Sequence, residues 1–107
     1  MLAKKYRLPI QVVIGKRGQS YKSRYFLLKI FANSLAFNRF GAVISKKVAP
    51  RAVDRNKLKR QIFNFFKNNS LPVQNPNQNK DFLIIAFPGI LSVEKKDFIS
   101  DLGKLFF

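Results

Sequence analysis

The sequence predicts a single α+β domain. Stretches with the alternation of β-strands and stretches with the 3.6-residue period of helices follow one another along the chain. Its 107 residues contain no internal repeat and suffice for one domain with a modest core. Hydrophobic residues make up 47% of the chain, with 12 Phe among them, so we expect a folded protein rather than a disordered basic tail. We therefore treat residues 1–107 as one domain.

The N-terminal residues are basic and structurally ambiguous. Residues 1–7 form a basic arm, and residues 9–14 fit either a strand or a short helix, because proline is tolerated in a first helical turn. Residues 15–18 place two glycines around Lys16 and Arg17, which is typical of a basic turn.

Two strands are predicted over residues 23–31 and 39–45. One face of the first strand is uniformly apolar, so we expect it to face the core. We expect the second strand to pair antiparallel with the first. The predicted core face of the first strand consists of Phe26, Leu28 and Ile30, and its other face consists of Tyr25, Leu27, Lys29 and Phe31. In the second strand, Ala42 and Ile44 lie on one face, and Val43 and Ser45 lie on the other.

A basic helix is predicted to begin near Asp54, which suits an N-cap or a first turn. Its apolar positions recur at i, i+4, i+7 and i+8, so they lie on one face and are expected to be buried. The opposite face is cationic. The apolar face consists of Leu58, Ile62, Phe65 and Phe66; the other consists of Asn56, Arg60, Phe63 and Lys67, flanked by Arg55, Lys57 and Lys59.

The C-terminal third predicts a loop, a strand and a helix. Residues 68–80 are rich in Asn and Pro and suit a loop. Residues 82–87 are continuously apolar, as in a strand buried on both faces. Capping and the helix dipole predict that a final helix starts at Ser92, with Glu94 and Asp97 near its N-terminus. Its apolar stripe is Phe98, Leu102, Leu105 and Phe106.

The charge of the chain is large and uneven. The formal net charge is +16, and residues 1–80 hold 18 Lys and Arg against one acid, whereas residues 81–107 hold three against four. Such a charge predicts a polyanionic partner, either nucleic acid or an anionic membrane surface. A generally basic solubilising surface is the alternative, but net charges of about 2 to 8 suffice for that purpose.

The residue inventory argues against an independent active site. The chain has no Cys and no His, so it lacks disulfides, thiolate metal sites and histidine acid-base catalysis. Its acids form no spaced pair of metal ligands, and we expect them to cap a helix (Asp54), mark a strand start (Asp81) and lie on a surface helix. We expect no catalytic residue and no protein metal site. The absence of a signal-peptide pattern and of an apolar run of the ~20 residues needed to span a bilayer predicts a cytoplasmic protein.

Two ordered basic motifs narrow the class of partner. The first reads R-x-G-x-x-x-S-K-K and the second A-V-x-R-N-x-x-K-R, and together they resemble the protein subunit of bacterial ribonuclease P. The stretches SRYF and DFLIIAFP are similar to other strands of that family. The matching residues are Arg39, Gly41, Ser45, Lys46 and Lys47, then Ala52, Val53, Arg55, Asn56, Lys59 and Arg60.

The chain also departs from the family pattern at four places. Phe63 stands where the family usually has Arg, and Phe87 stands where it usually has a basic residue. The loop at residues 49–51 is one residue longer than usual and lacks the usual Gly. The first helix, which the resemblance favours for residues 9–14, is short and lacks the family's aromatics.

The resemblance implies both a fold and a function. The fold is an αβββαβα sandwich with a left-handed β-α-β crossover, like the second domain of ribosomal protein S5, against the usual hand of such connections. The function is to bind a catalytic RNA, one protein per RNA. That RNA removes the 5′ leader from precursor tRNA with Mg²⁺ ions held by the RNA and not by the protein.

The resemblance also implies two groups of site residues. The planar guanidinium of Arg can donate two hydrogen bonds to one phosphate, and the ammonium group of Lys attracts a phosphate as a point charge. The Asn side chain can both donate and accept hydrogen bonds. A strand face would line a cleft for the single-stranded leader, where aromatic rings stack on bases. The RNA-binding residues are Arg55, Asn56, Lys57, Lys59, Arg60, Lys46, Lys47 and Ser45; the leader-binding residues are Tyr25, Lys29, Phe31 and Val43.

Several alternatives remain at the level of the sequence. A ribosomal or general RNA-binding protein explains the charge but not the ordered motif pair, and a membrane-surface or antimicrobial protein is disfavoured by the strand content.

The basic helix face is alternatively a solvated surface, although it lacks the Glu residues that usually pair with such cations. The leader-binding aromatics equally suit the core. Phe63 suits either stacking on RNA or covering the loop at residues 68–80.

Overall fold

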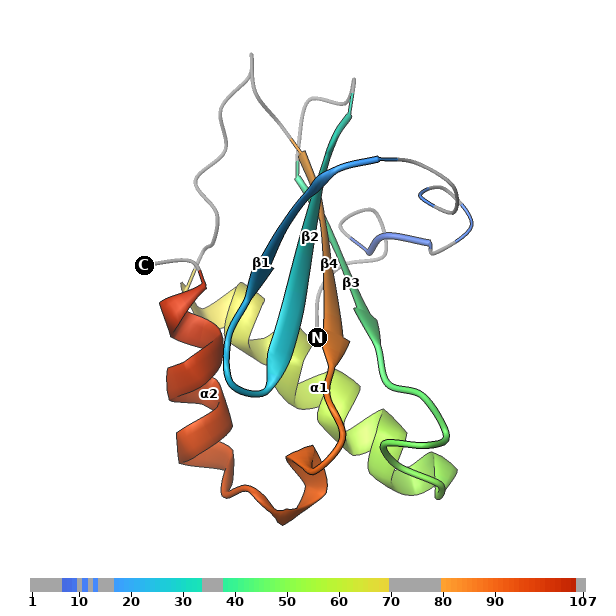
Figure 1. The fold of residues 1–107 in the computed structure, drawn as a ribbon, viewed down its shortest axis with the longest axis vertical. Coiled ribbons are helices and arrows are strands. Elements are labelled where there is room, and N and C mark those ends of the chain that lie inside the picture. The colour runs from blue at the N-terminus through green and yellow to red at the C-terminus, as the bar shows by residue number, and fades with distance from the viewer. Residues whose placement is uncertain are drawn as a thin grey trace.

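The computed structural model describes residues 7–9, 11, 13, 17–33, 38–69 and 80–105. In this part of the chain, two α-helices pack on one face of a four-stranded sheet, which confirms the predicted α+β class (Figure 1). Half of the predicted N-terminal helix at residues 9–14 lies outside the described residues, as do residues 70–79 of the predicted loop at residues 68–80; the ends of that loop belong to α1 and β4. The elements are β1 (Gln19–Lys22), β2 (Phe26–Ala32), β3 (Arg39–Val43), α1 (Ala52–Asn69), β4 (Lys80–Ala86), the short 3₁₀ helix η3 (Ile90–Ser92) and α2 (Lys95–Lys104).

The strand order is β1-β2-β4-β3, so β4 lies between the two strands predicted to pair with each other. Strand β2 pairs antiparallel with β4, and β3 pairs parallel with β4. The predicted antiparallel pairing of β3 with β2 is therefore wrong. Strand β4 takes the central position because its residues are apolar on both faces, and such a strand is stable only where both faces are covered.

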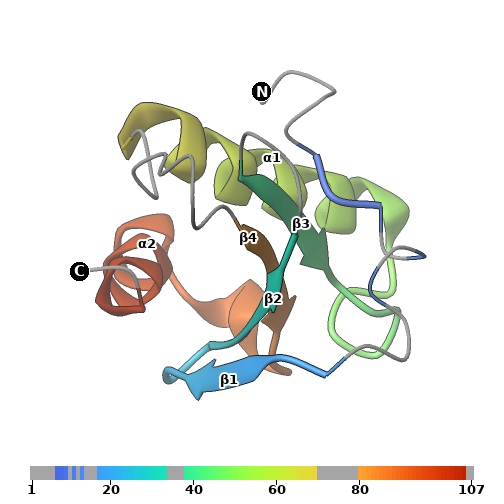
Figure 2. The ribbon, with the colours of Figure 1, turned by 90° about the horizontal axis from the view of Figure 1, so that it is seen from above.

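The connection from β3 through α1 to β4 forms the crossover of the fold. Both strands run downwards in Figure 1, β4 lies to the left of β3, and α1 lies behind the sheet, as the view in Figure 2 also shows. This arrangement is left-handed, as predicted, and opposite to the usual rule. It places the whole of α1 across the sheet, with its N-terminus next to the end of β3.

The main core lies between the sheet and the two helices. All four predicted apolar positions of α1 are buried in it. The Phe40 ring of β3 stacks on Phe66 of α1 and on Phe82 of β4, with centroid separations of 4.4 and 5.5 Å. The predicted core face of β2 is confirmed, since Phe26 and Leu28 are buried and Ile30 packs against the same cluster.

A second, smaller cluster lies on the outer face of the sheet, the face turned away from the helices. Leu8 and Val13 from the N-terminal segment are buried there with Phe31 and Leu83. The backbone N–H of Leu8 donates to the carbonyl of Phe40 at 2.7 Å, and a Cβ on Gly41 would lie 3.0 Å from the Leu8 carbonyl oxygen. The glycine of the first motif thus lets this segment lie directly on β3.

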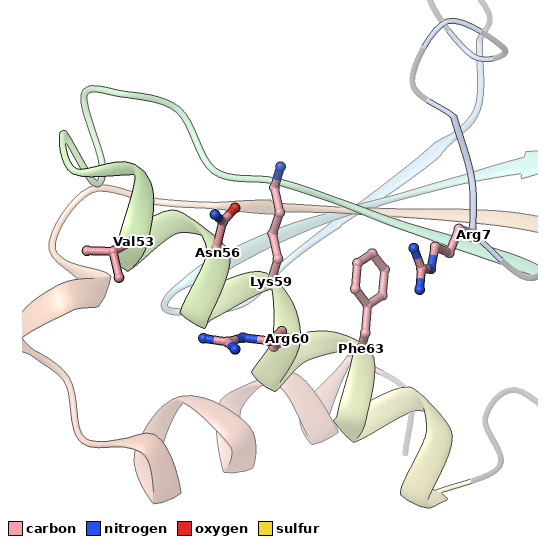
Figure 3. Close-up of a pocket in the computed structure, with 6 residues that line it drawn as sticks. All are labelled: Arg7, Val53, Asn56, Lys59, Arg60 and Phe63. Atoms are coloured by element: carbon pink, nitrogen blue, oxygen red, sulfur yellow. The ribbon is translucent and has the colours of Figure 1, made fainter. Parts of the chain in front are cut away.

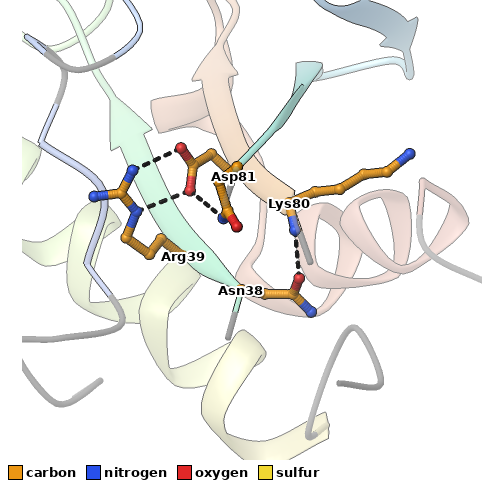
Figure 4. Close-up of polar contacts among 5 residues, drawn as sticks. Asn38, Arg39, Lys80 and Asp81 are labelled. Carbon is orange, nitrogen blue, oxygen red and sulfur yellow. Dashed lines mark hydrogen bonds and ion pairs between the residues drawn. The ribbon is translucent and has the colours of Figure 1, made fainter. Parts of the chain in front are cut away.

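Asp81 is fully buried and forms an ion pair between β3 and β4 (Figure 4). Its carboxylate accepts two hydrogen bonds from Arg39 and one from Asn33 Nδ2, each at 2.8 Å. The hydrogen bonds between Arg39 and Asp81 raise the pKa of Arg39 above its ordinary value, although burial opposes that shift. Asp81 does lie near the strand start, but its main role is to hold Arg39, its partner in the parallel register.

Asp101 corrects the expectation that the last acids lie on a surface helix. It is 5% exposed and binds the turn between β1 and β2. Its carboxylate accepts hydrogen bonds from the Ser23 hydroxyl at 2.6 Å and from the backbone N–H groups of Arg24 and Tyr25 at 3.1 and 2.9 Å. The SRYF stretch is therefore the turn through which the hairpin is attached to α2.

The final helix begins later than predicted. Ser92 lies in η3, where its hydroxyl donates to the Gly89 carbonyl, and α2 starts at Lys95 with Glu94 at the N-cap. The stripe formed by Phe98 and Leu102 is buried as predicted, and Leu105 packs against it, whereas the fourth predicted position, Phe106, lies outside the described residues. Asp54 lies in the first turn of α1 rather than at its N-cap. Neither α1 nor α2 is long and apolar enough to span a membrane.

Candidate nucleic-acid interface

The exposed side of α1 borders an open groove of about 610 Å³. Asn56 and Arg60 are exposed, whereas Lys59 and Phe63 are half-buried. Across the groove lies Arg7, in the N-terminal segment beside β3 (Figure 3). The lining consists of Arg7, Val53, Asn56, Lys59, Arg60 and Phe63.

Helical spacing explains why these side chains share one side of α1. Residues three, four and seven positions apart lie on the same face of a helix, so Asn56, Lys59 or Arg60, and Phe63 follow one another along the groove. The buried face, with Leu58 and Ile62, fixes the rotation of the helix. The same pattern that buries the apolar stripe therefore presents the cations of the second motif.

The sequence alone did not identify two of the lining residues as part of a site. The sequence places Arg7 only in a basic arm; in the structure a parallel bridge with Phe40 of β3 brings Arg7 beside the groove that α1 borders. Val53 belongs to the second motif but was not predicted as a contact, and it is 56% exposed at the end of the groove. The signal available in the sequence was that Val53 belongs to the second motif but not to the apolar stripe of Leu58, Ile62, Phe65 and Phe66.

The electrostatic character of the groove is uniform. Among the described residues, its lining includes three cationic side chains and no carboxylate. Asp54, the acid of α1, lies instead beside a separate hollow of about 220 Å³ between α1 and the η3–α2 region. Lys57 lines that second hollow too, so it does not join Lys59 and Arg60 in the groove. Among the predicted RNA-binding residues, the groove unites Asn56, Lys59 and Arg60.

Arg55 has a structural partner in the loop before α1. Its guanidinium donates hydrogen bonds of 2.9 Å to the carbonyl oxygens of Ala49 and Pro50. These bonds hold the loop that is one residue longer than the family pattern. Part of the hydrogen-bonding capacity of Arg55 is therefore used within the protein, and its side chain does not line the groove.

Ser45, Lys46 and Lys47 are exposed in the turn that follows β3. The backbone N–H of Val48 lies 3.3 Å from the Ser45 hydroxyl and 3.1 Å from the Ser45 carbonyl oxygen, so Ser45 initiates this turn. The turn leads into the N-terminus of α1. The two lysines thus extend the basic surface beyond the groove without lining it.

The four predicted leader-binding residues do not share one open face. Tyr25 precedes β2 and packs against the main core, with the Arg24 guanidinium 5.4 Å from its ring centroid. Phe31 is only 4% exposed, in the outer cluster against which Val43 packs. Lys29 is half-buried on β2. The predicted placement of Tyr25 with Phe31 is wrong, because Tyr25 lies at the turn held by Asp101 and not within the strand.

Metal-ligating side chains do not gather in groups of three or more anywhere in the described ranges. Asp81 and Asp101 are both engaged by hydrogen-bond donors of the protein itself. The chemistry that the described surface offers is thus recognition of a polyanion by cations, an amide and an aromatic ring.

The family model and the similar proteins of known sequence all indicate the same protein family. The family model described as Ribonuclease P matches residues 5–107. The ribonuclease P protein component of Desulforapulum autotrophicum is 29% identical over 93 residues, which cover 87% of this chain and 76% of the relative. The protein of the same description from Fusobacterium nucleatum is 32% identical, with coverages of 83% and 80%.

Solved structures show the same likeness. The ribonuclease P protein of Staphylococcus aureus has a TM-score of 0.79 and 28% identity, covering 92% of this chain and 90% of that one. The ribonuclease P protein of Thermotoga maritima, solved in complex with 1-(4-fluorophenyl)-2-thiourea, has a TM-score of 0.78 and 27% identity, covering 94% of this chain and 96% of that one.

Proposed function

Because the chain belongs to the ribonuclease P protein family, we propose that it is the RNA-binding protein subunit of a ribonuclease P. In this role it assists a catalytic RNA that removes the 5′ leader from precursor tRNA. The protein contributes binding and positioning, and the RNA contributes the reaction. Mg²⁺ ions are held by the RNA.

The observation that carries this proposal is the cationic groove beside α1. Lys59, Arg60 and Arg7 border it, no carboxylate lines it in the part of the chain that the structure describes, and the chain has a net charge of +16. A folded RNA presents closely spaced phosphates, and neutralising several of them at once releases counterions and favours association. The groove and the family match together favour one specific RNA partner over general affinity for polyanions.

The predicted contacts divide into groups with different roles. Lys59, Arg60 and Asn56 meet the RNA along the groove, and the exposed Lys46 and Lys47 extend the contact at the end of β3. Arg55 holds the preceding loop and offers its remaining donors to phosphate. Lys57 lies on a neighbouring surface, where it adds to the long-range attraction of the RNA.

We also propose that the 5′ leader of precursor tRNA lies along the outer face of the sheet. Lys29 offers a charge there, and Phe31, Leu83 and Val43 form an apolar floor. Leu8 and Val13 are buried in the same cluster as Phe31, so a leader base reaches that ring only when these two side chains are displaced. Tyr25 is more exposed, at the far turn of the hairpin, and is available to a longer leader.

The remaining parts of the proposal follow from this function. One protein is proposed to bind one RNA. A complex that acts on precursor tRNA works where RNA is transcribed, so the proposed location is the cytoplasm, with no membrane partner. The protein has no catalytic residue of its own.

Reconstitution tests the proposed function. The purified chain, freed of RNA, is mixed with precursor tRNA and Mg²⁺, with and without the catalytic RNA of a relative such as that of F. nucleatum. We expect leader removal only when the catalytic RNA is present, and faster removal with the protein than without it at low Mg²⁺. Metal-dependent cleavage by the protein alone, or no stimulation by it, would contradict the proposal.

A matched pair of variants links the stimulation to the groove. Lys59→Gln with Arg60→Gln removes two charges from the groove, whereas Lys96→Gln with Lys104→Gln removes two exposed charges from α2. Both doubles have the same net charge. We expect the first to reduce stimulation strongly at low protein concentration and the second to leave it nearly unchanged.

A further inference from the structure

One aromatic side chain, Phe63, interrupts the cationic side of α1. Its ring follows Lys59 by about one turn and extends into the groove toward Arg7 (Figure 3). It is half-buried and packs on one side against the main core, which fixes its position. A phenyl ring carries no charge and donates no hydrogen bond, so it does not attract a phosphate. This part of the groove therefore suits a part of a polyanion other than its phosphates.

We propose that the groove is a binding subsite for an unpaired nucleotide, whose base stacks on Phe63 while its phosphates meet Lys59 and Arg60. The subsite deepens the proposed function, because the nucleotide belongs to the RNA partner. Unpaired bases of RNA stack on aromatic side chains, and every base offers a suitable face.

The dimensions of the groove fit one nucleotide with its flanking phosphates. Its volume of about 610 Å³ is within the usual range for small-molecule sites, about 300 to 1,000 Å³. Since a helix rises about 1.5 Å per residue, Asn56 and Phe63 lie about 10 Å apart along α1. Asn56, with one donor and one acceptor function, is therefore placed at the neighbouring nucleotide rather than at the stacked base.

The proposed occupant predicts a preference for single strands. In a duplex the base faces are covered by their neighbours, so only the phosphates remain available to Lys59, Arg60 and Arg7. Phe63 therefore contributes to the affinity for single-stranded RNA and not to the affinity for duplex RNA. The cations contribute to both.

The test is a binding titration of the full chain with two probes. One is a short single-stranded oligoribonucleotide with a single fluorescent 2-aminopurine, and the other is a blunt duplex of the same length. Phe63→Leu keeps apolar packing against the core and removes the ring, whereas Phe63→Tyr keeps the ring. Circular dichroism confirms folding, and Phe63→Met replaces the leucine variant should that variant fail to fold.

We expect Phe63→Leu to weaken single-strand binding by between about fivefold and a hundredfold, with less quenching of the fluorescent base. Duplex affinity and the salt dependence should stay unchanged, and Phe63→Tyr should bind as the parent chain does. Equal single-strand affinity of the leucine variant, or equal losses for both probes, would overturn the subsite. This result is independent of the reconstitution, because no catalytic RNA is present and stimulation of cleavage can persist without stacking.

Discussion

Breaking the ion pair between Arg39 and Asp81 should destabilise the protein strongly without removing an RNA contact. The Asp81 side chain is fully buried and that of Arg39 is 17% exposed, so Arg39→Gln leaves a buried carboxylate without its cation. Removal of one partner from such a pair costs about 3 to 5 kcal/mol, a large part of the 5 to 15 kcal/mol that stabilises a typical domain. Because the pair fixes the register between the strands that α1 connects, we expect a cooperative loss of the whole fold.

Urea unfolding followed by circular dichroism measures this cost, and the chain offers a matched control. The ion pair of Lys96 with Glu94 is exposed, so Glu94→Gln should change stability by no more than about 0.5 kcal/mol. The double change Arg39→Met with Asp81→Leu should recover most of the loss, since an apolar replacement leaves no buried charge.

The pH dependence of this pair provides a second check. The pKa of Arg39 is raised in the folded protein, so its contribution is fully present below its ordinary pKa and is lost only as the pH rises through the raised value. We expect no loss of stability from Arg39 between neutral pH and pH ~10. Unchanged stability of Arg39→Gln together with weaker RNA binding would refute this reasoning and make Arg39 an RNA contact.

Three further predictions concern single residues. Leu58→Ala should cost about 2 to 5 kcal/mol in urea unfolding through lost core packing, whereas Arg60→Glu should keep the melting temperature and weaken RNA binding; the reverse outcome would mean that α1 is rotated. Asp101→Ala should cost at least about 1 to 3 kcal/mol, because buried N–H donors lose their acceptor, and hydrogen exchange at Tyr25 should report it. Phe31→Ala should cost about 3 to 5 kcal/mol and also reduce the preference of the assembled enzyme for precursor over mature tRNA; equal losses for both tRNAs would assign Phe31 to packing alone.

The parts of the fold that depend on local patterns were predictable. The spacing of Leu58, Ile62, Phe65 and Phe66 identified the buried side of α1, and the continuous apolar run identified β4 as buried on both faces. These patterns follow from the geometry of a helix or strand alone. Pairing of strands is not local, and so nothing within residues 23–45 indicated that β4 would lie between β2 and β3.

The candidate site was predicted in part for the same reason. Helical spacing placed Asn56, Lys59 and Arg60 on one side of α1, and the structure brings these three together. The contribution of Arg7 depends on a bridge to β3, which no motif records. Burial of Asp101 likewise depends on a turn 76 to 78 residues away in the chain.

The salt dependence of RNA binding tests the central claim most directly. The association constant with the catalytic RNA is measured across a range of salt concentrations for the parent chain and for the two charge-matched double variants. Each phosphate contact contributes about 0.7 to 0.9 to the log-log slope, so Lys59→Gln with Arg60→Gln should reduce its magnitude by about 1.4 to 1.8. The Lys96→Gln, Lys104→Gln control should retain the parent slope. A flat salt response of the parent chain, or the same change of slope in both doubles, would contradict the assignment of the groove beside α1 as the RNA-binding surface.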